Sequence, residues 1–145
     1  MSANHRPRVG YTLVELALVL VVIGLTAAVG IRQVHLYLDR IATRDAVRAA
    51  GALVERARDE AIALHTVVSV RVDTASASLE LLASGVPPAR TLLGAMHGVT
   101  LSTSRDSITF DVRGLGYGAA NLTLVTRRGR AADTLTTSRL GRVRY

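Results

Sequence analysis

The sequence predicts an α+β fold in which one long N-terminal α-helix packs on a small antiparallel β-sheet or sandwich head. From residue 9 to residue 31 the chain is apolar and carries one charge, Glu15. Apolar residues then recur at spacings of three to five as far as Leu64, which is the pattern of an amphipathic helix. From Thr66 onward apolar and polar residues alternate in short runs, which predicts strands.

The apolar segment is long enough to cross a membrane. It has 23 residues between Arg8 and Arg32, and a helix needs about 20 to span a ~30 Å hydrocarbon core. A secretory signal peptide, cleaved near Ala27 and Ala28, or a plain membrane anchor would explain the length and the basic leader. Neither explains Glu15, because a carboxylate inside such a segment costs on the order of 3 kcal/mol and is by default a functional residue.

A partner for Glu15 arises if the chain is cut after Gly10. The new α-amine of Tyr11 then lies one helical turn from Glu15 and can neutralise the Glu15 of a neighbouring copy at low dielectric. The basic leader, Gly10, the spacing to Glu15 and the apolar length together resemble the type III signal of type IV prepilins and type II secretion pseudopilins. Most members of that family have Phe where this chain has Tyr11.

The resemblance implies how the N-terminus is processed. Residues 1–10 are then a leader peptide that a prepilin peptidase removes on the cytoplasmic side, and Tyr11 is N-methylated. Residues 11–31 become a single-pass anchor in the inner membrane and later the core of a filament of pilin or pseudopilin subunits. The remaining chain becomes a periplasmic head.

Composition argues against an enzyme. Without residues 1–10 the chain has 135 residues, enough for one anchored helix and one small domain. There is no cysteine, the four histidines are scattered singly, and no acid pair or Ser/His/Asp arrangement stands out. We therefore expect no catalytic residue, no metal site and no cofactor.

The two periodicities predict one continuous helix of about 50 residues, with an apolar part over 11–31 and an amphipathic part over 32–65. Gly24 and Gly30 interrupt the apolar part, where they either permit close packing or local melting in a filament or are simply tolerated in a lone helix. The small residues 49–52 would let a sheet approach the helix closely. The apolar face of the second part is predicted to contain Val34, Leu38, Ile41, Ala46, Ala49, Leu53, Ala57, Ala61 and Leu64.

Residues 66–145 are predicted to form the β-rich head, with six to eight short strands. The first hairpin is expected around Val68–Asp73 and Leu79–Leu81, and residues 85–88, with two prolines, are expected to form a loop. Later strands are predicted around Val99 to Leu101, Ile108 to Val112, Leu122 to Leu124, and Leu135. Gly114, Gly116 and Gly118 are not a phosphate loop, because a strand-like segment and not a helix follows them.

Positive charge is concentrated at the C-terminal end. The chain has 18 arginines, no lysine and 11 acidic residues, and residues 105–145 hold eight arginines against three aspartates, net +5. This asymmetry indicates a polyanionic partner or, alternatively, a solvated basic face that keeps the domain soluble. The candidate binding residues are Arg127, Arg128, Arg130, Arg139, Arg142 and Arg144, together with Gly141.

The last residues have a pattern of their own. If the segment is extended, Arg142 and Arg144 project from one face while Val143 points to the core, and such a pair can grip successive phosphates. Residues 108–111 with Arg113 and Gly114, followed by strands and the closing Gly141-Arg142-Val143-Arg144, resemble the C-terminal region of the GspH/FimT family of minor pseudopilins. In the FimT branch this terminal motif is the DNA-binding element.

The resemblance leaves two roles open. One is a minor type IV pilin that binds DNA without sequence specificity during natural transformation, through arginine–phosphate contacts; the charge distribution favours it. The other is a tip pseudopilin of a type II secretion system with no DNA role. A third reading, independent of the family, is an ordinary single-pass membrane protein with a periplasmic β-domain. Only Tyr117 and Tyr145 lie near the patch as candidates for base stacking, and Tyr117 fits a turn or core role better.

Overall fold

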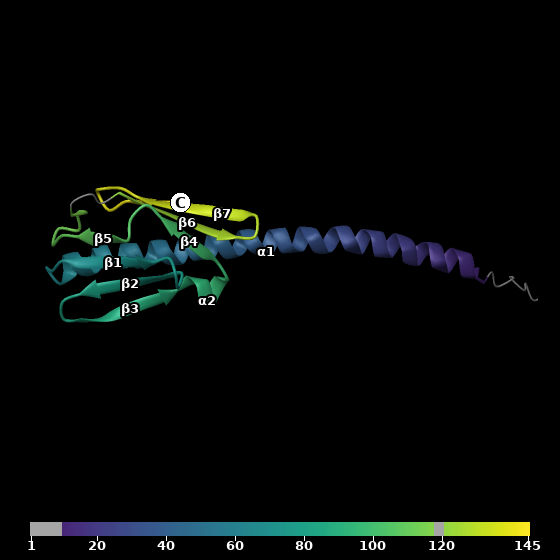
Figure 1. Cartoon of the computed structure of the whole chain (residues 1–145), viewed down its shortest axis with the longest axis horizontal. Helices are drawn as coiled ribbons and strands as arrows, with labels where there is room; N and C mark the ends of the chain where they lie inside the picture. The colour runs from purple at the N-terminus through teal and green to yellow at the C-terminus, as the bar shows by residue number, and fades with distance from the viewer. Residues whose placement is uncertain (1–9, 118–120) are drawn as a thin grey trace, which may run out of the picture. The chain divides into compact units, whose positions relative to one another are not determined.

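The structure, a computed structural model, describes residues 10–117 and 121–145, and it confirms the predicted α+β fold. Helix α1 (Leu13–Ala63) has 51 residues and is followed by eight strands and one short helix (Figure 1). The leader with Arg6 and Arg8, and Gly118 of the glycine-rich loop, lie outside the described residues.

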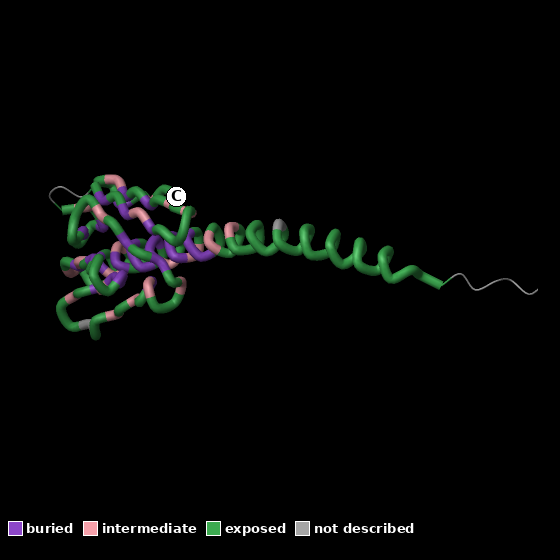
Figure 2. The backbone as a smooth tube through the Cα atoms, turned by 45° about the vertical axis from the view of Figure 1, so that its right-hand side comes forward, coloured by how far each residue is buried: buried purple, intermediate pink, exposed green. Residues whose placement is uncertain are grey.

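The chain divides into two compact units, one ending at His35 and the other comprising Leu36–Tyr145. In the first unit the large apolar side chains from Tyr11 to Ile31 that the structure describes are exposed (Figure 2). Among the described residues, α1 is the one helix long and apolar enough to cross a membrane, by length and composition. These side chains therefore need lipid or another protein to cover them.

The second unit contains two four-stranded antiparallel sheets. The first has the order β3-β2-β1-β5 and the second β4-β6-β7-β8. The strands of the first sheet are β1 (Val68–Asp73), β2 (Ser78–Ala83), β3 (Val86–Leu92) and β5 (Ser107–Phe110). Those of the second are β4 (Thr100–Thr103), β6 (Leu122–Arg128), β7 (Ala131–Thr137) and β8 (Val143–Arg144). The strand number agrees with the prediction.

Both sheets and the second half of α1 share one hydrophobic core. The helix contributes mainly small side chains; Ala46, Ala50, Ala57 and Ala61 are each fully buried. The sheets contribute larger side chains, and those fully or almost fully buried include Leu79, Leu81, Phe110, Leu122, Leu124 and Leu135. In the predicted small segment, Ala50 is buried while Ala52 faces solvent.

The buried part of the helix is shorter than its predicted apolar face. Val34, Leu38 and Ile41 are exposed, and burial begins only at Ala42. The β6–β7 hairpin reaches α1 at Asp39, to which the Arg128 guanidinium is paired at 3.1 Å. Leu64 follows the last helical residue and is also exposed.

The segment with two prolines was predicted as a loop, but Pro87 and Pro88 belong to β3. This is allowed because β3 is an edge strand, so a missing N–H need not interrupt the ladder. The short helix α2 (Leu93–His97) was not predicted; its five residues are too few to show a period, and the fully buried Leu93 holds it to the core. Val112 lies beyond the end of β5 and is exposed.

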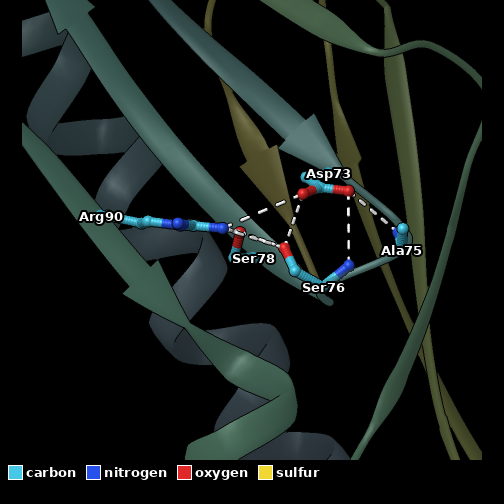
Figure 3. A network of polar contacts seen from close by, with 5 residues as sticks. All are labelled: Asp73, Ala75, Ser76, Ser78 and Arg90. Carbon is cyan, nitrogen blue, oxygen red and sulfur yellow. Dashed lines mark hydrogen bonds and ion pairs between the residues drawn. The ribbon is translucent and has the colours of Figure 1, made fainter.

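A polar network closes the turn between β1 and β2 (Figure 3). The backbone N–H groups of Ala75 and Ser76 and the Ser76 hydroxyl donate to the Asp73 carboxylate, at 2.9, 3.3 and 2.6 Å. Arg90 of β3 donates to the hydroxyls of Ser76 and Ser78, at 3.1 Å each. These hydrogen bonds, above all the one from the Ser76 hydroxyl, hold the pKa of Asp73 below its usual value.

The lowered pKa of Asp73 makes the stability of the head depend on pH. The stabilisation is present above the unfolded-state pKa of ~3.9 and is lost as pH falls through the lower folded-state pKa. We therefore expect the urea midpoint of residues 33–145 to fall between pH 4 and pH 2.5, and to fall less in Asp73→Asn, which keeps an acceptor oxygen but cannot titrate. Equal losses in the two proteins would contradict this role for Asp73.

The packing of α1 in the shared core can be tested at one buried alanine. Ala50→Leu places three extra carbon atoms in a filled core and should lower the free energy of unfolding by about 1–3 kcal/mol. The control is Ala52→Leu two residues away on the exposed side, with an expected change within about 0.5 kcal/mol. Chemical denaturation of residues 33–145, which contain every buried side chain described, measures both. Similar effects would show that the core has room for a larger side chain at position 50.

Candidate functional sites

The N-terminal candidates lie at the start of α1. Tyr11 is 85% exposed, Gly10 to Thr12 precede the helix, and Glu15 is exposed in its first turn. The backbone N–H of Glu15 donates to the Thr12 hydroxyl at 3.2 Å, and the N–H of Leu16 donates to the Thr12 carbonyl at 3.2 Å. Thr12 is thus the N-cap, and the spacing Thr12-x-x-Glu15 is that of a capping box, which our sequence analysis missed.

The glycines of the N-terminal unit have no packing partner within the chain. A Cβ built on Gly10, Gly24 or Gly30 would meet none of the described atoms within 4 Å. In a helix interior a glycine costs about 1 kcal/mol relative to alanine, so Gly24 and Gly30 lower the stability of the helix without any gain inside the described chain. The described chain thus agrees both with close packing or local melting in a filament and with two glycines that a lone helix simply tolerates.

The structure separates the C-terminal candidates into two groups. The hairpin arginines, Arg127, Arg128 and Arg130, lie where β6 turns into β7, whereas the C-terminal arginines, Arg139, Arg142 and Arg144, lie beyond the other end of β7. Ala131 and Thr137 mark the two ends of that strand, so at ~3.3 Å per residue about 20 Å separate the groups. The predicted basic patch is therefore two patches.

Arg128 has a structural role. Its guanidinium is paired with Asp39 of α1 at 3.1 Å and donates to the His97 carbonyl at 2.7 Å, so it joins the hairpin to the helix and to α2. Arg127 and Arg130 are exposed, and neither has a carboxylate within 4.0 Å among the described residues. Of the hairpin arginines, these two are the ones available to a partner.

The C-terminal arginines are presented by a tight hairpin. The N–H of Gly141 donates to the Ser138 carbonyl and the N–H of Ser138 donates to the Arg142 carbonyl, each at 2.9 Å, which is a three-residue loop between β7 and β8. Gly141 has φ +73°, and a Cβ there would lie 2.9 Å from Cδ of Arg58. The glycine of the Gly141-Arg142-Val143-Arg144 motif is thus required by the turn and by the side chain beneath it.

Arg58 of α1 lies under this hairpin and connects it to the preceding loop. Its Nε donates to the Gly114 carbonyl at 3.1 Å, and the N–H of Gly116 donates to the Arg139 carbonyl at 3.1 Å. The loop is closed further by Asp111, whose carboxylate accepts from the N–H groups of Arg113 and Leu115, at 2.9 Å each; hydrogen bonding, mainly from Leu115, lowers the pKa of Asp111. Gly114 and Gly116 thus lie in a loop between strands, as predicted.

An open groove of ≈ 450 Å³, here called the Arg58 groove, runs between α1 and the C-terminal segment. Arg58, Arg142 and Arg144 line it together with Glu55 and Asp59. Arg142 and Arg144 are exposed while Val143 is half-buried, as the alternation predicts, and within the described residues neither arginine has a carboxylate within 4.0 Å. The arginines of the groove can attract an anion, whereas its two carboxylates repel one.

The C-terminal residue rests on the helix. A Cβ built on Gly51 would overlap the hydroxyl end of Tyr145, so Gly51 is where the tyrosine approaches α1. Burial raises the pKa of the Tyr145 hydroxyl, and the nearby Glu55 carboxylate raises it further. Tyr145 is still 63% exposed, and Tyr117, in the loop, is 74% exposed. Both rings are accessible, and the loop position agrees with the turn role predicted for Tyr117.

No metal ligand set is present in the described part of the chain: no three His, Asp or Glu side chains there are placed to hold an ion.

The role of Gly141 can be tested against a glycine with a similar backbone and open surroundings. Gly141→Ala should lower the free energy of unfolding by about 1–2 kcal/mol for the left-handed backbone, and by about 1 kcal/mol more if Arg58 moves and loses its bond to Gly114. Gly85 has φ +80° and no neighbour within 4 Å among the described atoms. Gly85→Ala is therefore the control for the backbone contribution alone. Denaturant unfolding compares the two; equal losses would show that Arg58 is free to move.

The solved structures that resemble this chain are of minor pilins and minor pseudopilins. No protein-family model and no curated protein matches the sequence. Among solved structures, the type IV minor pilin FimU of Pseudomonas aeruginosa matches with a TM-score of 0.61 at 19% identity, over 74% of this chain and 90% of that one. The minor pseudopilin EpsH of the Vibrio cholerae type 2 secretion system matches with a TM-score of 0.56 at 16% identity, over 70% of this chain and 94% of that one. The chain therefore has the fold of the minor pilins and minor pseudopilins.

Proposed function

We propose that this chain is a minor pilin or pseudopilin subunit of a type IV pilus-like filament, with a structural role and no catalytic one. The observation that carries this is the exposed apolar half of α1 in a chain whose head has the pilin fold. Exposed apolar side chains along a helix of this length need lipid before assembly and other helices after it. Gly24 and Gly30, which have no partner within the described chain, are then the positions where neighbouring helices approach most closely.

The N-terminus is then processed as in prepilins. A prepilin peptidase cleaves between Gly10 and Tyr11, and the new Tyr11 amine is methylated. Gly10 supports this, since the described chain has no packing reason for a glycine there. The basic leader stays on the cytoplasmic side of the inner membrane and the head on the periplasmic side, in agreement with the positive-inside tendency.

Glu15 then has two competing roles, as the partner of a neighbour's Tyr11 amine or as part of a local cap with Thr12. Glu15→Gln separates them, because glutamine also suits a capping box but has no charge. If the charge pair matters, Glu15→Gln should abolish incorporation into filaments while Thr12→Ser, which keeps the hydroxyl cap, should assemble normally. The measurement is the amount of subunit in sheared filaments, and normal assembly of Glu15→Gln would contradict the pairing.

Processing has its own test, the mass of the mature N-terminus after expression with a prepilin peptidase. We expect a product that begins at Tyr11 and carries one extra methyl group, and we expect Gly10→Leu to remain uncut. An uncut Met1 in the original chain, or a start near residue 29, would favour an ordinary single-pass membrane protein or a secreted one.

We further propose that the head binds DNA through the C-terminal arginines, Arg139, Arg142 and Arg144, without sequence specificity. The exposure of Arg142 and Arg144 and their lack of nearby carboxylate partners in the described structure support this. The hairpin arginines could extend the contact only on DNA long enough to reach both groups, since about 20 Å of β7 separate them. Arg128 contributes least, because it is already paired.

Fluorescence anisotropy on residues 33–145 with a labelled duplex tests this role. Arg142→Ala with Arg144→Ala should weaken binding and reduce the log–log salt slope by about 0.9 for each phosphate that the protein no longer binds. The control, Arg71→Ala with Arg105→Ala, changes the charge equally at exposed positions elsewhere. Glu55→Gln with Asp59→Asn should tighten binding, because it removes the opposing carboxylates of the Arg58 groove. Equal weakening by both arginine pairs, or no binding at all, would contradict the DNA role.

The second candidate function is a type II secretion pseudopilin without a DNA role. The observation that favours it is the presence of Glu55 and Asp59 in the same groove as Arg142 and Arg144, since mixed charge suits a protein partner better than a polyanion. Failure of the DNA test together with successful processing would point to this function.

A further inference from the structure

A second groove lies at the other end of the head and is not used by the proposed function. It has a volume of ≈ 440 Å³ and runs between α1 and β7; we call it the Tyr37 groove. Tyr37, Arg40, Ile41 and Arg44 line one side, at spacings that place them on one face of the helix, and Asp133 lies on the other side. All residues of the groove belong to the unit Leu36–Tyr145.

The chemistry of this face is amphipathic. Tyr37 is 64% exposed and Ile41 is 39% exposed, so an aromatic ring and an aliphatic side chain lie on the surface beside the arginines. Arg40 and Arg44 are exposed, one helical turn apart, and neither has a carboxylate within 4.0 Å among the described residues. The nearby Asp39 does not neutralise them, because it is paired with Arg128.

The position in the chain indicates the partner. Tyr37 follows the end of the apolar segment at Ile31 by six residues, and even a fully extended chain covers no more than about 3.6 Å per residue, or ~22 Å in all. When the apolar segment lies in a bilayer, the groove therefore lies no more than ~22 Å from the membrane surface. Tyrosine and arginine are the residues that suit this zone, tyrosine through its amphipathic ring and arginine through its affinity for phosphate.

We propose that the Tyr37 groove binds the headgroup of an anionic phospholipid, with Arg40 and Arg44 on the phosphate and with Tyr37 and Ile41 against the apolar parts of the headgroup region. The site would hold the head at the membrane surface before the subunit enters a filament. Hairpin residues Arg127 and Arg130, exposed near the same end of β7, add positive charge that attracts an anionic surface. This inference requires the apolar segment to lie in a membrane; it requires neither cleavage at Gly10 nor DNA binding.

Native mass spectrometry of the full chain tests the site, with the protein released from detergent micelles that contain equal amounts of phosphatidylglycerol or phosphatidylcholine. The chain should retain more phosphatidylglycerol than phosphatidylcholine. Arg40→Gln with Arg44→Gln should reduce that retention about fivefold for each arginine, and glutamine keeps the helix propensity. The control, Arg71→Gln with Arg105→Gln, makes the same charge change outside the groove and should leave retention unchanged.

Several outcomes would overturn the proposal. They are equal retention of the two lipids, equal loss in both double variants, or binding of added inorganic phosphate without any preference for phosphatidylglycerol. A dimer that disappears in Arg40→Gln with Arg44→Gln, while lipid retention stays the same, would instead assign the groove to a second copy of the chain. A failure here is separate from a failure of the filament proposal, which is measured by the mass of the N-terminus and by filament incorporation.

Discussion

The head depends on one constraint, the buried face of α1. This face is built mainly of small side chains, with Ala46, Ala50, Ala57 and Ala61 fully buried, and both four-stranded sheets contribute to one core with this single helix. Most of the large buried side chains come from the sheets, among them Phe110, the only phenylalanine in the chain. Neither sheet could bury its apolar face without this helix, because a sheet of four short strands has no second layer of its own.

Local contacts with α1 position the C-terminal segment. Gly51 leaves room for Tyr145 on the helix, and Gly141 turns the chain back above Arg58. These contacts carry the C-terminal segment along α1 and create the Arg58 groove between them. The placement of Arg142 and Arg144 is thus a product of packing, and Gly141 has a structural reason that is independent of any ligand. In the Gly-Arg-x-Arg motif, only the arginines are left for a functional explanation.

Residues that the fold explains can be separated from those that it does not. Arg128, Gly51 and Gly141 each have a packing or pairing partner within the head. Gly24, Gly30, Arg142 and Arg144 have none among the described residues, and the same is true of the apolar side chains before Ile31. The proposed function gives these residues their roles: the first half of α1 would be covered by lipid or neighbouring helices, and the arginines would meet an anion or a partner subunit. The proposed assembly and binding roles therefore lie at opposite ends of the chain.

The sequence by itself determined the fold class, the length of the helix to within a few residues and most of the strands, because these follow from local periodicity that packing did not override. Its spacing of Gly10, Tyr11 and Glu15 also predicts a processing and assembly signal, a prediction that rests on local sequence and that the tertiary structure does not test. Only the tertiary structure decided that Pro87 and Pro88 lie in an edge strand, that burial of the helix begins at Ala42, and that the basic residues form two groups. Each of these depends on which segments distant in sequence lie side by side, and a pattern of neighbouring residues does not contain that information.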